Sequence, residues 1–273
     1  MTQHILSLSY GKDSLACLGA IEQLGWTLDR IVHAEVWATD TIPADLPMMV
    51  EFKAKADEII KKRWGIEVEH VCAMDGEKKR TYESVFYRKR LSSKNGNKIH
   101  KIYGWPFQKG PWCNDRLKTS VLEKVNRQGV IYSGIAADEP ERISRWTGRL
   151  SMPLVEAGWT EAMCRKWCEE NDLLSPIYTT ATRGGCWFCH NQSVKQLRLL
   201  RKNHPELWAL MLKWDADSPV TFTSSGRTLR DYDLRFKLED LGAVPIGGKF
   251  RWADVAKRKQ IPGQISIEEV PCQ

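Results

Sequence analysis

The chain lacks any long hydrophobic run. None of its apolar stretches approaches the ~18 residues that a membrane-spanning helix needs, which argues against an integral membrane protein. Its first residues, Met-Thr-Gln-His-Ile-Leu-Ser-Leu-Ser, also lack the basic region, apolar stretch and cleavage site of a signal peptide. We therefore expect a cytoplasmic protein without a membrane partner.

The sequence also lacks internal repeats, low-complexity stretches and the composition of a disordered or fibrous chain. Hydrophobic residues make up 42% and charged residues 27%, which is typical of a globular protein. A chain of 273 residues buries enough surface to fold without disulfides. In a reducing compartment, its eight cysteines therefore suggest metal or redox chemistry.

Positive charge is concentrated in one segment, residues 77–110, whereas the rest of the chain is nearly neutral despite a net charge of +7. Six aromatic residues lie within this segment: Tyr82, Phe86, Tyr87, Tyr103, Trp105 and Phe107. Basic and aromatic side chains together can contact the phosphates and stack on the bases of a nucleic acid. The segment is thus a candidate surface for tRNA or DNA, or else a solvated loop and helix face.

Hydrophobic periodicity alternates between strand and helix patterns. Strands are predicted over 4–9, 31–37, 66–72 and 130–135, and helices over 14–24, 47–63, 115–125, 160–171, 194–214 and 229–241. This alternation predicts an α/β fold, a Rossmann-like parallel sheet with helices on both faces. We expect a nucleotide-binding domain over 1–215, with 77–110 as an insertion, and a C-terminal helical extension over 216–273.

The segment Ser9-Tyr10-Gly11-Lys12-Asp13-Ser14 joins the first predicted strand to the first predicted helix. Gly11 lets the backbone pass close to a ligand, and the start of the helix offers amide groups and a positive dipole to an anion. Lys12 adds a charge, and the hydroxyls of Ser9 and Ser14 can donate to phosphate. The spacing is not that of a Walker A loop. The pattern predicts a phosphate-binding loop; the alternative is an ordinary capped turn.

A second motif is Cys186-x-x-Cys189, which follows Gly184-Gly185. Two thiolates at this spacing can hold one metal. The same pair could instead be a redox dithiol or two inert thiols.

These motifs bring a known family into view. The Ser9–Ser14 loop resembles the pyrophosphate loop of the ATP-pyrophosphatase superfamily, and its Gly-Lys-Asp-Ser form is similar to the phosphoadenosine phosphosulfate (PAPS) reductase branch. Ordered matches follow over about residues 5–200. They are Thr39-Asp40-Thr41, the segment Trp112 to Lys118, the segment Gly134 to Glu139 with Arg142, and the segment Arg183 to Cys189, which resembles DNA-phosphorothioation sulfurtransferases.

The resemblance implies an adenine nucleotide alpha hydrolase-like fold that binds ATP, or PAPS or APS (adenosine phosphosulfate), with Mg²⁺. The implied nucleotide-binding residues are Ser9, Gly11, Lys12, Asp13, Ser14, Asp40, Gly134, Glu139 and Arg142, with Lys12 and Asp13 catalytic and with Lys118 and Arg183 for substrate. It further implies an iron–sulfur cluster on Cys113, Cys186 and Cys189. Zinc, with His190 as a fourth ligand, is the alternative.

Three functions follow as hypotheses. The first is ATP-dependent sulfur transfer to a nucleic acid or small molecule, with a sulfur donor or thiol reductant protein as partner. The second is a PAPS or APS reductase that uses Cys272 as nucleophile. The third is a non-catalytic nucleic-acid binding module.

Overall fold

A computed structural model describes residues 2–91, 100–106, 110–125, 129–145, 150–179, 181, 184–247, 250 and 252. The chain forms two compact units, Met1–Arg227 and Thr228–Gln273. The division thus falls after Arg227, whereas the sequence places it after residue 215, inside helix α10 (Pro205–Asp217). No helix in the described part of the chain is long and apolar enough to cross a membrane.

The first unit is built on a five-stranded parallel sheet in the order β3-β2-β1-β6-β7. Its strands are β1 (His4–Ser7), β2 (Arg30–Glu35), β3 (Val68–Cys72), β6 (Val130–Tyr132) and β7 (Leu150–Ser151). Ile5 of the central strand lies opposite Arg30 on one side and Ile131 on the other. The chain therefore changes direction across the sheet at β1, and ligands of such sheets bind at this kind of switch point.

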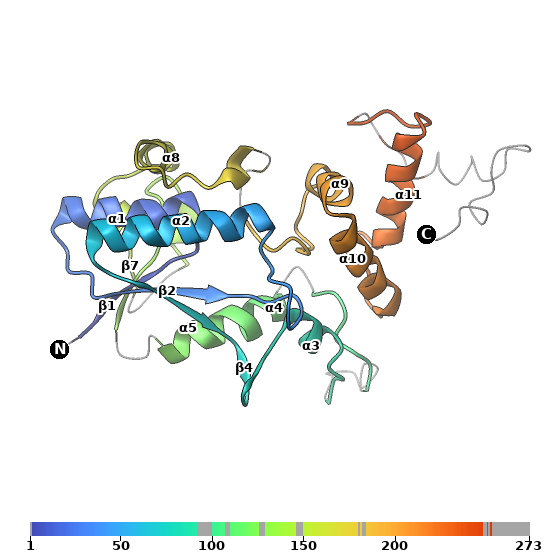
Figure 1. Ribbon diagram of the computed structural model, residues 1–273, viewed down its shortest axis with the longest axis horizontal. Helices are drawn as coiled ribbons and strands as arrows, with labels where there is room; N and C mark the ends of the chain where they lie inside the picture. The colour runs from blue at the N-terminus through green and yellow to red at the C-terminus, as the bar shows by residue number, and fades with distance from the viewer. Residues whose placement is uncertain are drawn as a thin grey trace, which may run out of the picture. The chain divides into compact units, whose positions relative to one another are not determined.

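Helices cover both faces of the sheet, as predicted. Figure 1 shows α1 (Lys12–Leu24), α2 (Pro47–Trp64) and α8 (Glu161–Glu170) on one side and α5 (Ser120–Val125) on the other. Right-handed connections between parallel strands require this, because the chain adds β2 and β3 on one side of β1 and then crosses over to add β6 and β7 on the other. Thr160 caps α8 by accepting a hydrogen bond from the amide of Met163.

Helices α1 and α8 pack closely against each other. A Cβ at Gly19 would lie 2.4 Å from Nε1 of Trp167, so only glycine lets the indole reach the α1 backbone. Cys164 and Cys168 of α8 are fully buried. The contact of Trp167 with Gly19 fixes α8 against the helix that follows the Ser9–Ser14 loop.

Three elements differ from the sequence prediction. The region 194–214 forms two helices, α9 (Val194–Asn203) and α10, because Pro205 has no amide hydrogen to continue the first helix. The helix predicted over 115–125 begins earlier, as α4 (Trp112–Asn114), and passes through a π-helical turn η1 (Asp115–Thr119) before α5. Strand β7 was too short to be recognised by periodicity.

The remaining elements are short, apart from one helix. They are β4 (Met74–Asp75), β5 (Lys78–Lys79), α3 (Tyr82–Phe86), α6 (Pro140–Ile143), α7 (Pro153–Glu156), η2 (Pro176–Thr179) and, in the second unit, α11 (Leu229–Asp240).

The predicted role of the aromatic residues in the basic segment 77–110 is wrong at three positions. Tyr82, Phe86 and Trp105 are at most 1% exposed and form a core, so they are not stacking platforms for bases. Large aromatic rings stabilise more by burial than by exposure. Arg80 and Arg88 both form ion pairs with Asp75. Phe107, Lys94, Lys98 and Lys109 lie outside the described residues. A nucleic-acid role for the rest of the segment stays a prediction.

Candidate nucleotide and cysteine site

The predicted phosphate loop joins the end of β1 to the start of α1. Its two serines are hydrogen-bonded to each other and to the loop: their hydroxyl oxygens lie 2.9 Å apart, and the Ser9 amide donates to Ser14 Oγ at 3.1 Å. The Ser14 hydroxyl donates to the Gly11 carbonyl at 3.0 Å. Gly11 is the N-cap residue and has no side chain to cover the first turn of α1. The serines thus shape the loop, and the backbone of Gly11 opens it to a ligand.

Tyr10 positions the loop through contacts with α2 and β2. It has a left-handed backbone (φ 57°), which only a strong set of contacts maintains in a bulky residue. Its hydroxyl donates to Asp57 of α2, and its ring packs edge-on against His33 at 4.7 Å. His70 lies 2.9 Å from the other oxygen of Asp57 and 2.8 Å from Glu35. A partly buried polar network therefore positions the bend of the loop.

This network predicts a pH dependence of stability. Hydrogen bonds to Asp57 and then Glu35 raise the pKa of His70 to about 9. Because the folded pKa exceeds the unfolded value of about 6.5, the stabilisation is complete below pH ~6.5 and is lost as pH rises through ~9. The His70 side chain is 31% exposed, so solvent screens these interactions. We therefore expect His70 to contribute only about 1–2 kcal/mol to the free energy of unfolding.

Urea unfolding between pH 6 and 10 measures this effect. The variant His70→Gln should unfold with a flatter pH profile over that range. An equal decline in both proteins would assign the pH dependence to other groups.

Gly134, just after β6, touches the first turn of α1. A Cβ at this position would lie 2.6 Å from the Ser14 amide nitrogen and 2.8 Å from the carbonyl carbon of Asp13. These are backbone atoms, which cannot turn aside as a flexible side chain can. Gly134 therefore lets the chain after β6 approach the Ser9–Ser14 loop.

A cavity of about 330 Å³ opens at the carboxyl ends of β1, β2 and β6. The predicted site residues that line it are Ser9, Gly11, Asp13, Ser14, Lys118, Gly134, Arg142 and Cys186. The cavity thus joins three segments that are far apart in the sequence, namely the loop, the α4–α5 region and the cysteine motif.

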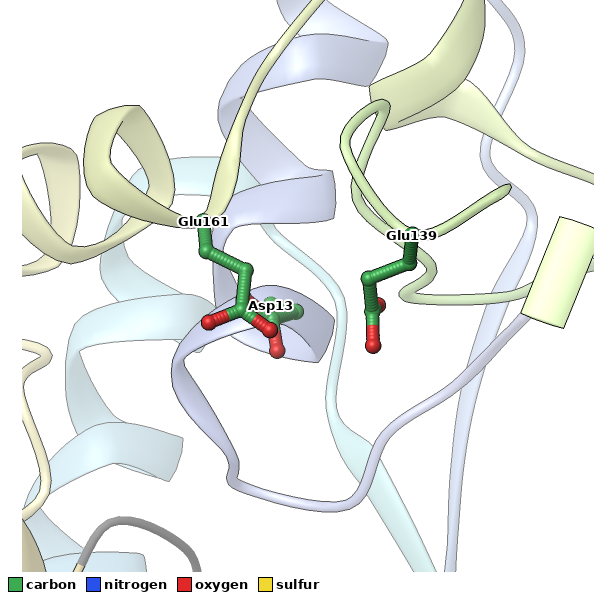
Figure 2. Close-up of side chains that lie close together, drawn as sticks. All are labelled: Asp13, Glu139 and Glu161. Atoms are coloured by element: carbon green, nitrogen blue, oxygen red, sulfur yellow. The ribbon is translucent and has the colours of Figure 1, made fainter. Parts of the chain in front are cut away.

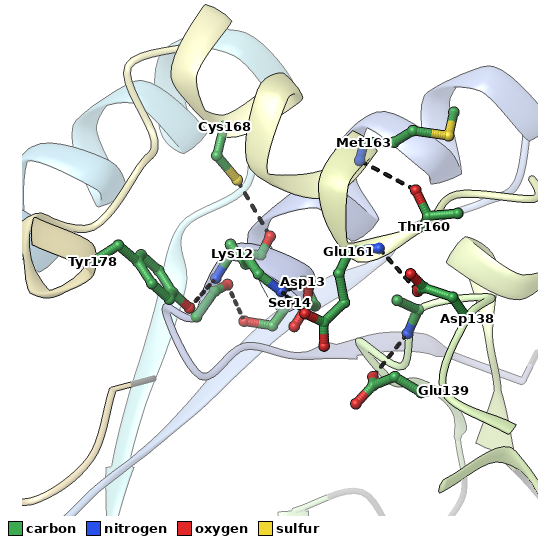
Figure 3. Close-up of polar contacts among 12 residues, drawn as sticks. Lys12, Asp13, Ser14, Asp138, Glu139, Thr160, Glu161, Met163, Cys168 and Tyr178 are labelled. Atoms are coloured by element: carbon green, nitrogen blue, oxygen red, sulfur yellow. Dashed lines mark hydrogen bonds and ion pairs between the residues drawn. The ribbon is translucent and has the colours of Figure 1, made fainter. Parts of the chain in front are cut away.

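Lys12 does not line this cavity. Its ammonium lies 2.6 Å from Asp13 and 3.3 Å from Glu161 of α8, while its amide donates to the Tyr178 hydroxyl at 3.0 Å (Figure 3). Burial alone would lower the pKa of Lys12, but the hydrogen bond and charge of Asp13, with Glu161, raise it. The side chain therefore stays charged and neutralises acidic groups beside the loop.

Three carboxylates gather next to the loop. One oxygen from each of Asp13, Glu139 and Glu161 lies within 4.8 Å of the others, and Figure 2 shows the side chains converging from α1, the loop after β6 and α8. Burial raises the pKa of Asp13, and Lys12 offsets only part of that rise. Glu139 also accepts from Arg142 at 2.7 Å. Oxygen ligands of this kind suit a divalent cation such as Mg²⁺.

Other predicted residues lie elsewhere. Asp40 is exposed and does not line the cavity, and Arg183 lies outside the described residues, as does Cys272. Instead, the cavity is lined by Lys53, whose ammonium lies 2.9 Å from His33, and by Tyr178. No local pattern marks these residues, because each comes from a helix or turn that only folding brings to the loop.

The three candidate metal ligands come from two segments, Cys113 in α4 and Cys186 and Cys189 in the turn before α9. Burial raises the pKa of Cys113 to about 12 and that of Cys186 to about 11, and the charge of Lys118 opposes both shifts. Within the described residues, their sulfur atoms do not all lie within 4.8 Å of one another. A tetrahedral zinc site would space them by about 3.8 Å, from Zn–S bonds of ~2.3 Å.

The surroundings of these cysteines nevertheless fit a thiolate-bound metal group. The Tyr82 ring packs against Trp112 and Phe188, which are sequence neighbours of these cysteines, and the buried hydroxyl of Tyr82 has no hydrogen-bond partner in the described structure. Thiolates of this number can bind an iron–sulfur cluster as well as zinc, so both stay candidates.

No family model, no curated protein and no solved structure matches the chain.

Proposed function

We propose that this chain is a PAPS reductase-like protein of the pyrophosphate-loop superfamily that binds ATP and transfers sulfur to a nucleic acid or small molecule. One observation carries the proposal: a single cavity has the Ser9–Ser14 loop on one wall and Cys186 on another. A nucleotide bound by its phosphates at the loop would therefore have a sulfur group within the same enclosure.

The polyphosphate would lie at the start of α1. Gly11 and Ser14 bring the first turn of that helix to the cavity. Three cations line it: Lys53, which pairs with Asp45; Arg142, which pairs with Glu139; and Lys118. Helix amides and cations at fixed positions stabilise a pyrophosphate leaving group. The carboxylates of Asp13, Glu139 and Glu161 would hold Mg²⁺ beside those phosphates.

In the proposed reaction, an oxygen of the acceptor attacks the α-phosphorus of ATP and pyrophosphate leaves. The terminal sulfur of a persulfide on the donor protein then attacks the activated atom and displaces that oxygen as part of AMP. A thiol reductant cleaves the resulting sulfur–sulfur bond, which leaves the outer sulfur on the acceptor and takes the donor away as a mixed disulfide. An iron–sulfur cluster held by Cys113, Cys186 and Cys189 would supply sulfur or electron transfer at this wall of the cavity. Lys118 is close to both the proposed phosphate site and the cysteine motif. It lines the cavity, and its charge opposes the raised pKa of Cys186.

The test is pyrophosphate release from ATP by anaerobically purified protein, with and without RNA or DNA. We expect release that rises when an acceptor is present. Release of sulfite from PAPS or APS instead, abolished by Cys272→Ser, would favour the reductase. Nucleic-acid binding without any nucleotide turnover would favour the non-catalytic module.

Lys118→Met should weaken ATP binding by about 10–100-fold, since a hydrogen bond to a charged group contributes roughly 1.5–3 kcal/mol. Isothermal titration calorimetry measures the change. Lys124→Met is the matched control, because Lys124 is exposed on α5 and does not line the cavity. Equal affinities for the two variants would show that the phosphates bind elsewhere.

A further inference from the structure

Tyr82 lies between the two segments that carry the candidate metal ligands. Its ring centroid is 4.9 Å from that of Trp112, the residue before Cys113, and 4.1 Å from that of Phe188, which stands between Cys186 and Cys189. One side chain of α3 thus contacts both cysteine segments.

The hydroxyl of Tyr82 is a buried donor that lacks an acceptor. The residue is 1% exposed, and its oxygen has no hydrogen-bond partner in the part of the chain that the structure describes. A buried polar group left in this state costs about 1–3 kcal/mol, which phenylalanine would avoid while keeping the ring contacts.

The ring contacts of Tyr82 indicate the class of the missing acceptor. Trp112 and Phe188, against which the ring packs, are flanked in sequence by Cys113 and by Cys186 and Cys189. A phenol hydroxyl has one hydrogen to donate. A sulfur atom that carries negative charge in a metal-bound thiolate is an acceptor of the right kind.

We propose that Tyr82 is a positioning residue that donates its hydroxyl hydrogen to a sulfur of a metal group held by Cys113, Cys186 and Cys189. The inference rests on the metal group of the proposed function. Outer-shell hydrogen bonds of this kind orient the ligands and stabilise their charged form, and those to cluster sulfurs also set the reduction potential. Tyr82 thereby positions both cysteine segments around one metal group.

The variant Tyr82→Phe tests this role because it keeps the ring and removes only the oxygen. In anaerobic competition with a chelator, we expect its metal binding to weaken about 10–100-fold. After the metal is stripped, its unfolding temperature should equal or exceed that of the wild type, because an unpaired buried oxygen has been removed. If the centre is a redox-active cluster, its reduction potential should become more negative.

Tyr132→Phe is the control. The Tyr132 hydroxyl donates to the Thr27 carbonyl at 2.9 Å, so its loss should lower stability equally with and without metal and leave metal affinity unchanged.

Three results would overturn the proposal. Unchanged metal affinity in Tyr82→Phe refutes the hydrogen bond from Tyr82 but leaves the proposed metal group in place. Equal destabilisation of the loaded and stripped forms assigns Tyr82 to packing. Wild-type protein that holds no metal after anaerobic purification removes the acceptor, and this failure of the proposed function is visible before any variant is made.

Discussion

Gly134→Ala should largely abolish nucleotide binding while the protein still folds. The new Cβ would lie 2.6 Å from the Ser14 amide nitrogen and 2.7 Å from the Ser14 Cα. Because both atoms belong to the backbone, β6 and the loop must separate, which distorts the anion site. Overpacking of this kind costs about 1–3 kcal/mol of stability. We expect ATP affinity, measured by calorimetry, to fall at least about tenfold.

Gly184→Ala provides the matched control for this variant. Gly184 lines the same cavity, but a Cβ there would meet no atom within 4 Å, and its backbone is not left-handed. The control should retain both stability and affinity. Normal ATP binding by Gly134→Ala would place the nucleotide away from the loop and contradict the site itself.

Cys186→Ser should remove the metal and the sulfur chemistry but leave the nucleotide site intact. A serine hydroxyl does not ionise at neutral pH and so cannot replace a thiolate ligand. Metal content should fall to below about a tenth of the wild-type value, whereas ATP affinity should change less than about threefold. Metal analysis, visible absorption and calorimetry on anaerobic protein measure these quantities.

The control is Cys72→Ser. Cys72 ends β3 and is half-buried, and its thiol contacts the sulfur of Met74 at 3.6 Å. Its loss should leave metal content unchanged. If Cys186→Ser keeps its metal, the ligand set of Cys113, Cys186 and Cys189 is incorrect.

The place of the Ser9–Ser14 loop is the part of the candidate site that sequence analysis predicts best. Strand, glycine and helix are contiguous there, so hydrophobic periodicity and Gly11 together locate the loop within a few residues. The structure confirms a helix that begins at Lys12 and a loop that lines a cavity. The sequence alone does not predict the ion pair of Lys12 with Glu161, because Glu161 belongs to a helix about 150 residues later in the chain.

The basic segment shows why composition is a weaker guide. Alternating basic and aromatic residues fit either a nucleic-acid surface or a core bordered by charge. The buried positions of Tyr82, Phe86 and Trp105 decide for the core at those residues. Only contacts with later segments, such as that of Trp105 with Asp215, make the difference visible.

Local patterns in the chain were enough to predict an α/β sheet with helices on both faces, the place of the Ser9–Ser14 loop between a strand and a helix, and the cysteine motif, because neighbours in sequence encode each of these features. The tertiary structure alone brought Gly134 against the loop, Cys186 into its cavity and Tyr82 between the cysteine segments. These contacts join residues separated by tens of positions, and their energies depend on close packing and burial, which periodicity and composition do not specify.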